Sequence, residues 1–148
     1  MPSLEEMLNK KGEEIEEAPL IPVGTYLVLL KGSPIFGQSS QKKTDYVDFP
    51  GQFLRAEPDV DPTALAEFGG IEGKELKAGR SGLRFYLTEG TLPQVKRFFV
   101  EHLGLEEAKT LKEWIAEAPG HQVLVSFKHE PSQDGSRMYS SVARTMRP

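Results

Sequence analysis

The order of strand-like and helix-like segments is the feature that most constrains the fold of this chain. Five segments have strand-like composition and periodicity, and two helical segments follow one another between the third and the fourth of them. The strand-like segments are residues 25–31, 45–56, 83–87, 122–128 and 138–144, and the helical ones are 92–103 and 110–118. Because helices and strands do not alternate, the order argues against a parallel sheet. We predict a mainly β fold with accessory helices, built as a five-stranded antiparallel barrel that is partly open.

Residues 81–104 show the clearest pattern, a strand that leads into a helix. Alternation within the strand separates an apolar face from a polar face that carries Arg84 and Tyr86. Thr91 and Gln94 are spaced to cap the helix start with their side chains. The helical spacing places five apolar residues on one face, which we expect to be buried: Leu92, Val95, Phe98, Phe99 and Leu103. The stretch therefore predicts one surface for the core and one for a ligand.

The second strand-like segment is interrupted by Pro50, which has no N–H to donate to a neighbouring strand. A bend at this point would let a small barrel turn a corner. The alternation across the bend leaves two alternatives for the inward residue, Phe53 and Leu54. Residues 32–43 before it are expected to form a polar loop with two adjacent lysines.

The chain has 148 residues, which is the length of a single domain. We predict the barrel domain over residues 19–148, with an acidic insertion at about 57–79 that contains a short helical turn at 62–68. Residues 1–18 form an acidic leader, for which two alternatives stand. It is either a disordered segment or a helix that docks a partner, starting at the capping box of Ser3 and Glu6.

The net charge of −4 lies entirely in the leader, because the remaining 130 residues carry 16 acidic and 16 basic side chains. Within that neutral body, residues 57–75 are acidic, whereas residues 77–97 carry five basic side chains and one acidic one. Such an asymmetry can steer a polyanion to one face of a protein even when its net charge is negative.

The chain lacks the residues that several classes of function require. The chain has no cysteine, no apolar run of the roughly 20 residues that span a bilayer, and an acidic rather than secretory N-terminus. The glycine-rich segment at residues 69–74 fails the phosphate-loop pattern at two positions, and the three histidines lack metal-ligand spacing. We expect a soluble cytoplasmic protein, or one of the host cytoplasm if viral, that is not an enzyme and needs no metal or cofactor.

Basic and aromatic side chains recur on the polar faces of the predicted strands and in the first loop. Proteins that bind single strands use cations to contact phosphates and aromatic rings to stack on bases. The candidate nucleic-acid-binding residues are Lys42, Lys43, Tyr46, Phe53, Arg55, Arg84, Tyr86, Lys128, Arg137, Tyr139 and Arg144. The alternative interpretation is that these are ordinary solvent-facing side chains.

Seven segments between residues 20 and 145 follow a characteristic order. They are Pro22–Tyr26, the bent second strand, Leu83–Leu87, the helix 92–103, the helix with Trp114, Gly120–Val125 and Tyr139–Val142. This order resembles that of small single-stranded-DNA-binding OB-fold proteins from bacteriophage replication and recombination modules. The resemblance implies an OB-like barrel with DNA on the strand face of Arg55, Arg84, Tyr86 and Tyr139 and on the Lys42-Lys43 loop.

The resemblance implies a sequence-tolerant single-stranded-DNA-binding protein for viral DNA replication or recombination. The partners would be single-stranded DNA and, through the acidic leader, replication or recombination proteins; an oligomer is compatible with the sequence, and no membrane partner is expected. Two features depart from the family pattern, because the acidic residues lie in the leader instead of a C-terminal tail and the insertion at 57–79 is long.

The main alternative is a structural or protein-interaction module, such as a virion or assembly component. A weaker alternative is a small hydrolase.

Overall fold

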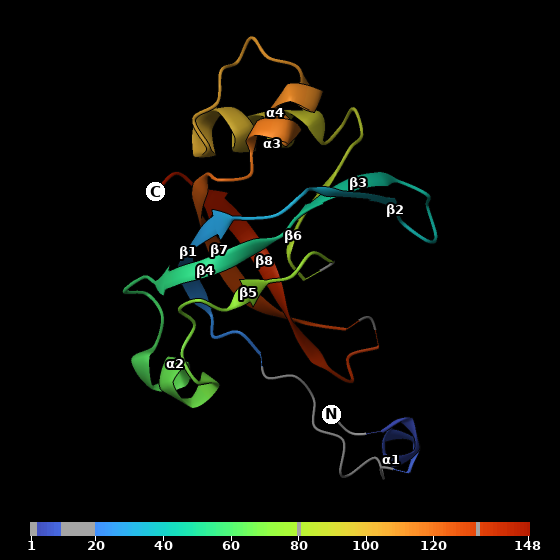
Figure 1. Cartoon of the computed structure of the whole chain (residues 1–148), viewed down its shortest axis with the longest axis vertical. Helices are drawn as coiled ribbons and strands as arrows, with labels where there is room; N and C mark the ends of the chain where they lie inside the picture. Colours follow the sequence, from blue (N-terminus) through green and yellow to red (C-terminus); the bar gives the residue numbers. More distant parts are fainter. Residues whose placement is uncertain (1–2, 10–19, 80, 133) are drawn as a thin grey trace.

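The computed structural model describes residues 3–9, 20–79, 81–132 and 134–148, and its strands form two antiparallel sheets (Figure 1). The larger sheet is strongly curled, so that it forms a half-barrel. In spatial order its strands are β5 (Glu75–Leu76), β4 (Gly51–Ala56), β1 (Gly24–Leu30), β7 (Gln122–Pro131) and β8 (Met138–Met146). The smaller sheet contains β2 (Ile35–Gln38), β3 (Asp45–Phe49) and β6 (Leu83–Tyr86). The prediction of a mainly β, antiparallel fold is confirmed.

The predicted bend at Pro50 is confirmed, and it does more than turn a corner. Pro50 separates β3 from β4, and these two halves of one expected strand belong to different sheets. The carbonyl oxygen of Pro50 accepts a hydrogen bond from the backbone N–H of Lys31 at 3.0 Å, which ties the bend to the end of β1. The chain therefore crosses from one sheet to the other at a residue that cannot donate to either ladder.

The prediction of a polar loop over residues 32–43 is wrong for part of its length, because β2 forms there and pairs with β3. Residues 32–34 and 39–44 remain outside strands, and we call residues 39–44 the hairpin tip. The tip is closed by hydrogen bonds from the backbone N–H of Ser39 to the carbonyl of Thr44, and from the N–H of Thr44 to Oγ of Ser39, both at 2.9 Å. The insertion likewise contributes the short strand β5, beside the expected helix α2 (Pro62–Phe68).

Phe53 belongs to the hydrophobic core, so its assignment to a base-stacking surface is wrong. Its side chain is only 2% exposed, and its ring lies 5.5 Å from that of Tyr26 and 5.7 Å from that of Phe127. Tyr26 is buried as well, and its hydroxyl donates to the carbonyl of Pro22 at 2.7 Å. The inward residue after the bend is therefore Phe53, and Leu54 is only half-buried.

The helices after β6 close one end of the curled sheet, whereas α2 lies at the opposite end (Figure 1). They are α3 (Leu92–Arg97), the π-helical turn η2 (Phe98–His102) and α4 (Leu111–Glu117). Phe99 connects them to the sheets, because its ring lies 5.8 Å from that of Phe49 and 5.6 Å from that of Trp114, which stacks on it. Burial of these large rings fixes the helices against the strands.

Two of the details predicted for these helices are wrong. Leu92 is 40% exposed, although the other four residues predicted on its helical face are buried. The side chain of Thr91 makes no capping hydrogen bond to α3. It instead donates to the carbonyl oxygens of Tyr86 and Thr88, so it closes the turn between β6 and the helix.

The prediction for the acidic leader falls largely on residues outside the described part of the chain. Within residues 3–9, Ser3 and Glu6 exchange the hydrogen bonds of a capping box ahead of the short helix α1 (Leu4–Leu8).

Candidate nucleic-acid interface

Four side chains gather on one face of the three-stranded sheet, and we call them the β6 cluster: Tyr46, Asp48, Arg84 and Tyr86. The register of β3 and β6 pairs Tyr46 with Tyr86 and Asp48 with Arg84. Because side chains alternate along a strand, both pairs lie on the same face. The neighbouring strand contributes Gly37, where a Cβ atom would lie 2.5 Å from the hydroxyl of Tyr46. Glycine at this position leaves room for the tyrosine ring to lie across β2.

Arg84 is held firmly within the cluster. Its Nε donates to Oδ1 of Asp48 at 2.8 Å and its Nη2 donates to Oδ2 at 3.0 Å, which is a bidentate ion pair. The guanidinium also lies over the ring of Tyr46, 3.7 Å from the ring centre. The Arg84 side chain is 16% exposed and that of Asp48 is 4% exposed. The hydrogen bonds that Arg84 donates to Asp48 raise the pKa of Arg84 further above its usual range, so the guanidinium stays charged.

Tyr86 is the most accessible ring of the cluster, with 37% of its surface exposed. Its ring meets that of Tyr46 edge to face, with the centres 6.1 Å apart. Its carbonyl oxygen accepts the hydrogen bond from Thr91, and this fixes the end of β6. A planar, partly exposed ring on a restrained strand is suited to stacking against another planar group.

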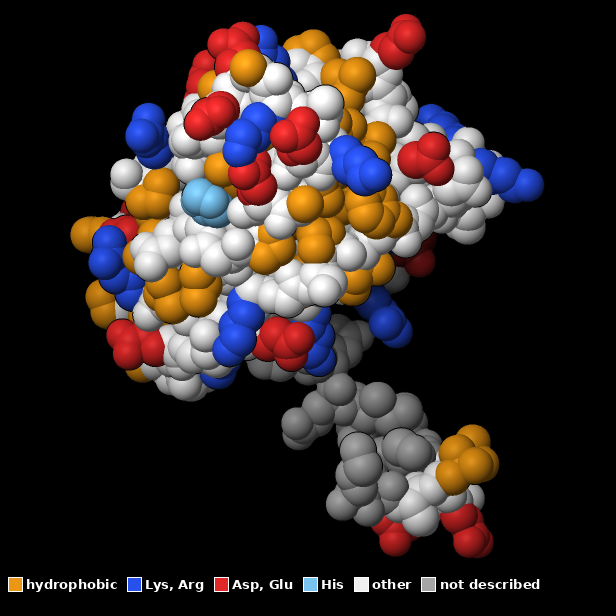
Figure 2. Space-filling model, turned by 45° about the horizontal axis from the view of Figure 1, so that its top comes forward, with side chains coloured by type: hydrophobic (Ala, Val, Ile, Leu, Met, Phe, Trp, Pro, Cys, Tyr) orange, Lys and Arg blue, Asp and Glu red, His pale blue; other side chains and the backbone are white. Residues whose placement is uncertain are grey.

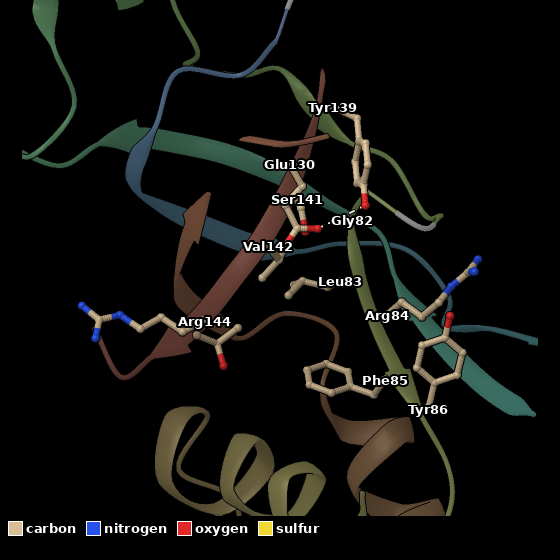
Figure 3. A pocket seen from close by; sticks show the side chains of 11 residues that line it. Gly82, Leu83, Arg84, Phe85, Tyr86, Glu130, Tyr139, Ser141, Val142 and Arg144 are labelled. Atoms are coloured by element: carbon tan, nitrogen blue, oxygen red, sulfur yellow. Dashed lines mark hydrogen bonds between the residues drawn. The ribbon is translucent and has the colours of Figure 1, made fainter. Parts of the chain in front are cut away.

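A hollow of about 370 Å³, here called the seam hollow, lies between β6 and β8, which belong to different sheets (Figure 3). In Figure 3, three apolar side chains lie between Arg84 and Arg144: Leu83, Phe85 and Val142. The polar side chains in its lining include Glu130, Tyr139, Ser141 and Thr145. The seam hollow therefore combines an apolar floor with polar walls, as ligand sites commonly do.

A second hollow of about 680 Å³, here called the tip hollow, lies between β6 and the hairpin tip. Arg84 and Tyr86 line both hollows, so the two meet at the β6 cluster. The further residues around the tip hollow are Ser39, Ser40, Gln41, Lys42, Thr44, Thr88 and Thr91. Figure 2 shows basic side chains at the end of the protrusion on the right, where Figure 1 places the hairpin. Together the linings of the two hollows extend along β6 from the hairpin tip to β8.

The structure brings together part of the predicted site. Tyr46, Arg84 and Tyr86 meet in the β6 cluster, Lys42 lines the tip hollow, and Tyr139 and Arg144 line the seam hollow. Lys128 is not part of the lining of the seam hollow, but it forms an ion pair with Glu130, which is.

The other predicted residues lie outside the linings of the two hollows. Lys43 is exposed in the hairpin tip, and Arg137 is exposed in the turn between β7 and β8. Arg55 is exposed on β4, where it forms an ion pair of 3.4 Å with Glu57. Phe53 lies in the core.

Sequence reasoning missed the two carboxylates of the site, Asp48 and Glu130. Each stands two residues from a predicted site residue in a strand, Asp48 after Tyr46 and Glu130 after Lys128. The period of two would have placed them on the same faces as those residues.

Within the described parts of the chain, no three His, Asp or Glu side chains converge to hold a metal ion. Nor does any described helix have the length and apolar character needed to cross a membrane.

Comparisons with protein-family models and with curated proteins found no match to this chain.

Proposed function

We propose that this protein binds single-stranded DNA with little dependence on sequence, through base stacking and phosphate contacts, and that it catalyses no reaction. The observation that carries the proposal is the meeting of the two hollows at Arg84 and Tyr86. Their linings run from the hairpin tip along β6 to β8, with Lys42 near one end and Arg144 near the other, and we propose this line as the path of the strand. Such a path supplies the cations and the exposed ring that single-strand binding requires.

The connectivity of the strands supports an OB-like interpretation of the barrel. With β3 and β4 counted as one bent strand, the neighbours run in the order β6, β3–β4, β1, β7 and β8. β6 then lies across the seam hollow from β8, where such a barrel would close. OB-folds bind oligonucleotides on their second and third strands and on the loop between the first and second. In this interpretation, the β6 cluster and the hairpin tip correspond to those positions.

We further propose that the bound DNA belongs to a viral replication or recombination system, which the protein serves in the host cytoplasm. This role rests on the resemblance of residues 20–145 to the bacteriophage proteins. It requires that the protein cover or present single strands, and the open path along β6 is compatible with both.

A titration of a labelled oligodeoxythymidine of about 12 nucleotides tests the proposal, because one OB-fold covers roughly 4–16 nucleotides. Fluorescence anisotropy at about 50 mM and 200 mM salt should show saturable binding that weakens as salt rises. Each phosphate contact contributes about −0.7 to the slope of log affinity against log salt. A protein that leaves the oligonucleotide free at the lower salt concentration does not have this function.

One observation favours the second candidate function, a protein-interaction module. β2 is an edge strand, and its Ile35 and Phe36 are 50% and 63% exposed. Figure 2 shows hydrophobic side chains near the base of the hairpin protrusion. Exposed edge strands pair readily with other chains. If this is the main function, Phe36→Asp should abolish self-association in sedimentation experiments, and the oligonucleotide should stay free at both salt concentrations.

A further inference from the structure

The seam hollow contains a carboxylate, Glu130, that phosphate binding does not explain. Its Oε2 accepts a hydrogen bond from the hydroxyl of Tyr139 at 3.1 Å, as Figure 3 shows, and its Oε1 forms an ion pair with Nζ of Lys128. A phosphate would be repelled by this carboxylate. The apolar floor formed by Leu83 and Val142 is equally unsuited to a charged backbone. The hollow is therefore better matched to a base than to a phosphate.

Glu130 is ionised at neutral pH, because Lys128 and then Tyr139 lower the pKa of its carboxyl group by hydrogen bonding to it. An ionised carboxylate only accepts hydrogen bonds, and its two oxygens offer about four acceptor positions. Lys128, Tyr139 and Ser141 are its partners within the protein. The Glu130 side chain remains 33% exposed and lines the hollow, so its oxygens can accept a further hydrogen bond from a donor that enters.

We propose that the seam hollow receives one nucleobase of the bound strand and that Glu130 accepts a hydrogen bond from the exocyclic amino group of that base. This inference rests on the proposed function and adds a preference at one position of the bound strand. Cytosine presents the N4 amino donor, whereas thymine and uracil present the acceptor O4 at the same place. The carboxylate would attract the first and repel the others, so cytosine is favoured over both pyrimidines that lack the amino group.

The dimensions and the neighbours of the hollow agree with this occupant. Its volume of about 370 Å³ lies within the range of small-ligand sites. The ring of Tyr139 stands at one side of it and Tyr86 at the other, so aromatic surfaces are available to the base or to the adjacent one (Figure 3). Arg144 is exposed beside the hollow, where a phosphate of the same nucleotide would find a cation.

Oligodeoxycytidine and oligodeoxyuridine of about 12 nucleotides are the sharpest pair of probes, because the two bases have the same size and differ only at the group on C4 and in the proton that uracil carries on N3. Titrated against the full-length protein at pH 7.5, the cytidine oligomer should bind about fivefold to tenfold more tightly. Glu130→Gln should reduce this ratio to less than about twofold, because the amide can donate to O4 as readily as it accepts from N4. Glu107→Gln is the matched control, since Glu107 also pairs with a lysine, Lys96, at 2.6 Å but lies outside the hollow. This control should keep the wild-type ratio.

The outcomes separate the inference from the proposed function. If neither oligomer binds at low salt, the proposed function fails and the inference fails with it. If both bind equally well to the wild type, or if Glu130→Gln keeps the full preference, the base-recognition role of Glu130 is overturned and single-strand binding stands. The wild-type ratio is decisive even if the Glu130 variant does not fold, because a tighter complex with oligodeoxyuridine contradicts the inference without any variant.

Discussion

The β6 cluster and the hairpin tip both present positive charge to the tip hollow, but they hold it in different ways. Arg84 is bound to Asp48 through two hydrogen bonds and its side chain is 16% exposed. Lys42 and Lys43 are exposed in a turn. The charge of Arg84 is neutralised within the protein, whereas the lysines attract counterions from solution. Only the lysines release those counterions when a phosphate arrives.

The two regions therefore contribute to binding in different ways. The β6 cluster contributes a fixed shape, and the hairpin tip contributes electrostatic attraction. The β6 cluster keeps Tyr46, Arg84 and Tyr86 in a fixed arrangement, so a stacked base costs little further ordering. The hairpin tip supplies charge that acts at longer range and weakens with salt. Variants in the two regions should therefore change different measured quantities. From the largest expected effect to the smallest, these are the stability, the affinity for DNA and the salt dependence of binding.

The largest expected effect is on stability, in Arg84→Ala. This change leaves the carboxylate of Asp48, 4% exposed, without its bidentate partner. Breaking a buried ion pair from one side costs about 3–5 kcal/mol. The free energy of unfolding, measured by urea denaturation, should fall by an amount in this range.

A double variant is the control, because replacing both members of a buried ion pair by apolar residues is often nearly neutral. Arg84→Met combined with Asp48→Leu should regain most of the stability lost in Arg84→Ala. If the double variant is as unstable as the single one, the ion pair is not what stabilises the β6 cluster.

The next largest effect is expected on affinity, in Tyr86→Ala. Loss of an aromatic stacking partner costs about 1–3 kcal/mol per base, which is roughly fivefold to 150-fold in affinity. The slope of log affinity against log salt should stay unchanged, because no charge is removed. Tyr86→Phe keeps the ring and should keep the affinity within about twofold. Equal losses in the two variants would mean that the hydroxyl group, and not stacking, contributes to binding.

The sequence predicted which residues of a strand share a face, but not which residues of other strands they meet. The period of two places Arg84 and Tyr86 on one face of β6, and the structure agrees. Asp48, the partner of Arg84, lies 36 residues earlier in the chain, and only the register of β3 against β6 brings it opposite. Register depends on long-range packing, which the local pattern does not contain.

Irregular backbone explains the other failures. Phe53 was a site candidate because the bend at Pro50 interrupts the alternation, and a further irregularity lies where β1 pairs with β4, between Leu27 and Val28. β2 has only four residues, and the glycines and polar residues on both sides of Ile35 and Phe36 favour a loop in the local pattern. Thr91 has the spacing of a cap, but its hydroxyl closes the turn after β6. In each case the structure depends on something that the alternation of residue types does not show: the pairing of β4 with β1, the pairing of β2 with β3, or the turn after β6.

The smallest expected effect is on salt dependence, in Lys42→Ala. Removing one phosphate contact should reduce the steepness of log affinity against log salt by about 0.7 and weaken binding about threefold to fivefold near 0.1 M salt. Lys112→Ala is the matched control, because Lys112 is an exposed lysine on α4 that lies outside the linings of both hollows. The slope of this variant should equal that of the wild type.

The Arg84→Met and Asp48→Leu double variant should also keep the wild-type slope, since it removes one positive and one negative charge together. If that variant flattens the slope and Lys42→Ala does not, the charge that meets the phosphates is on β6, and the division between the two regions is the reverse of the one argued above.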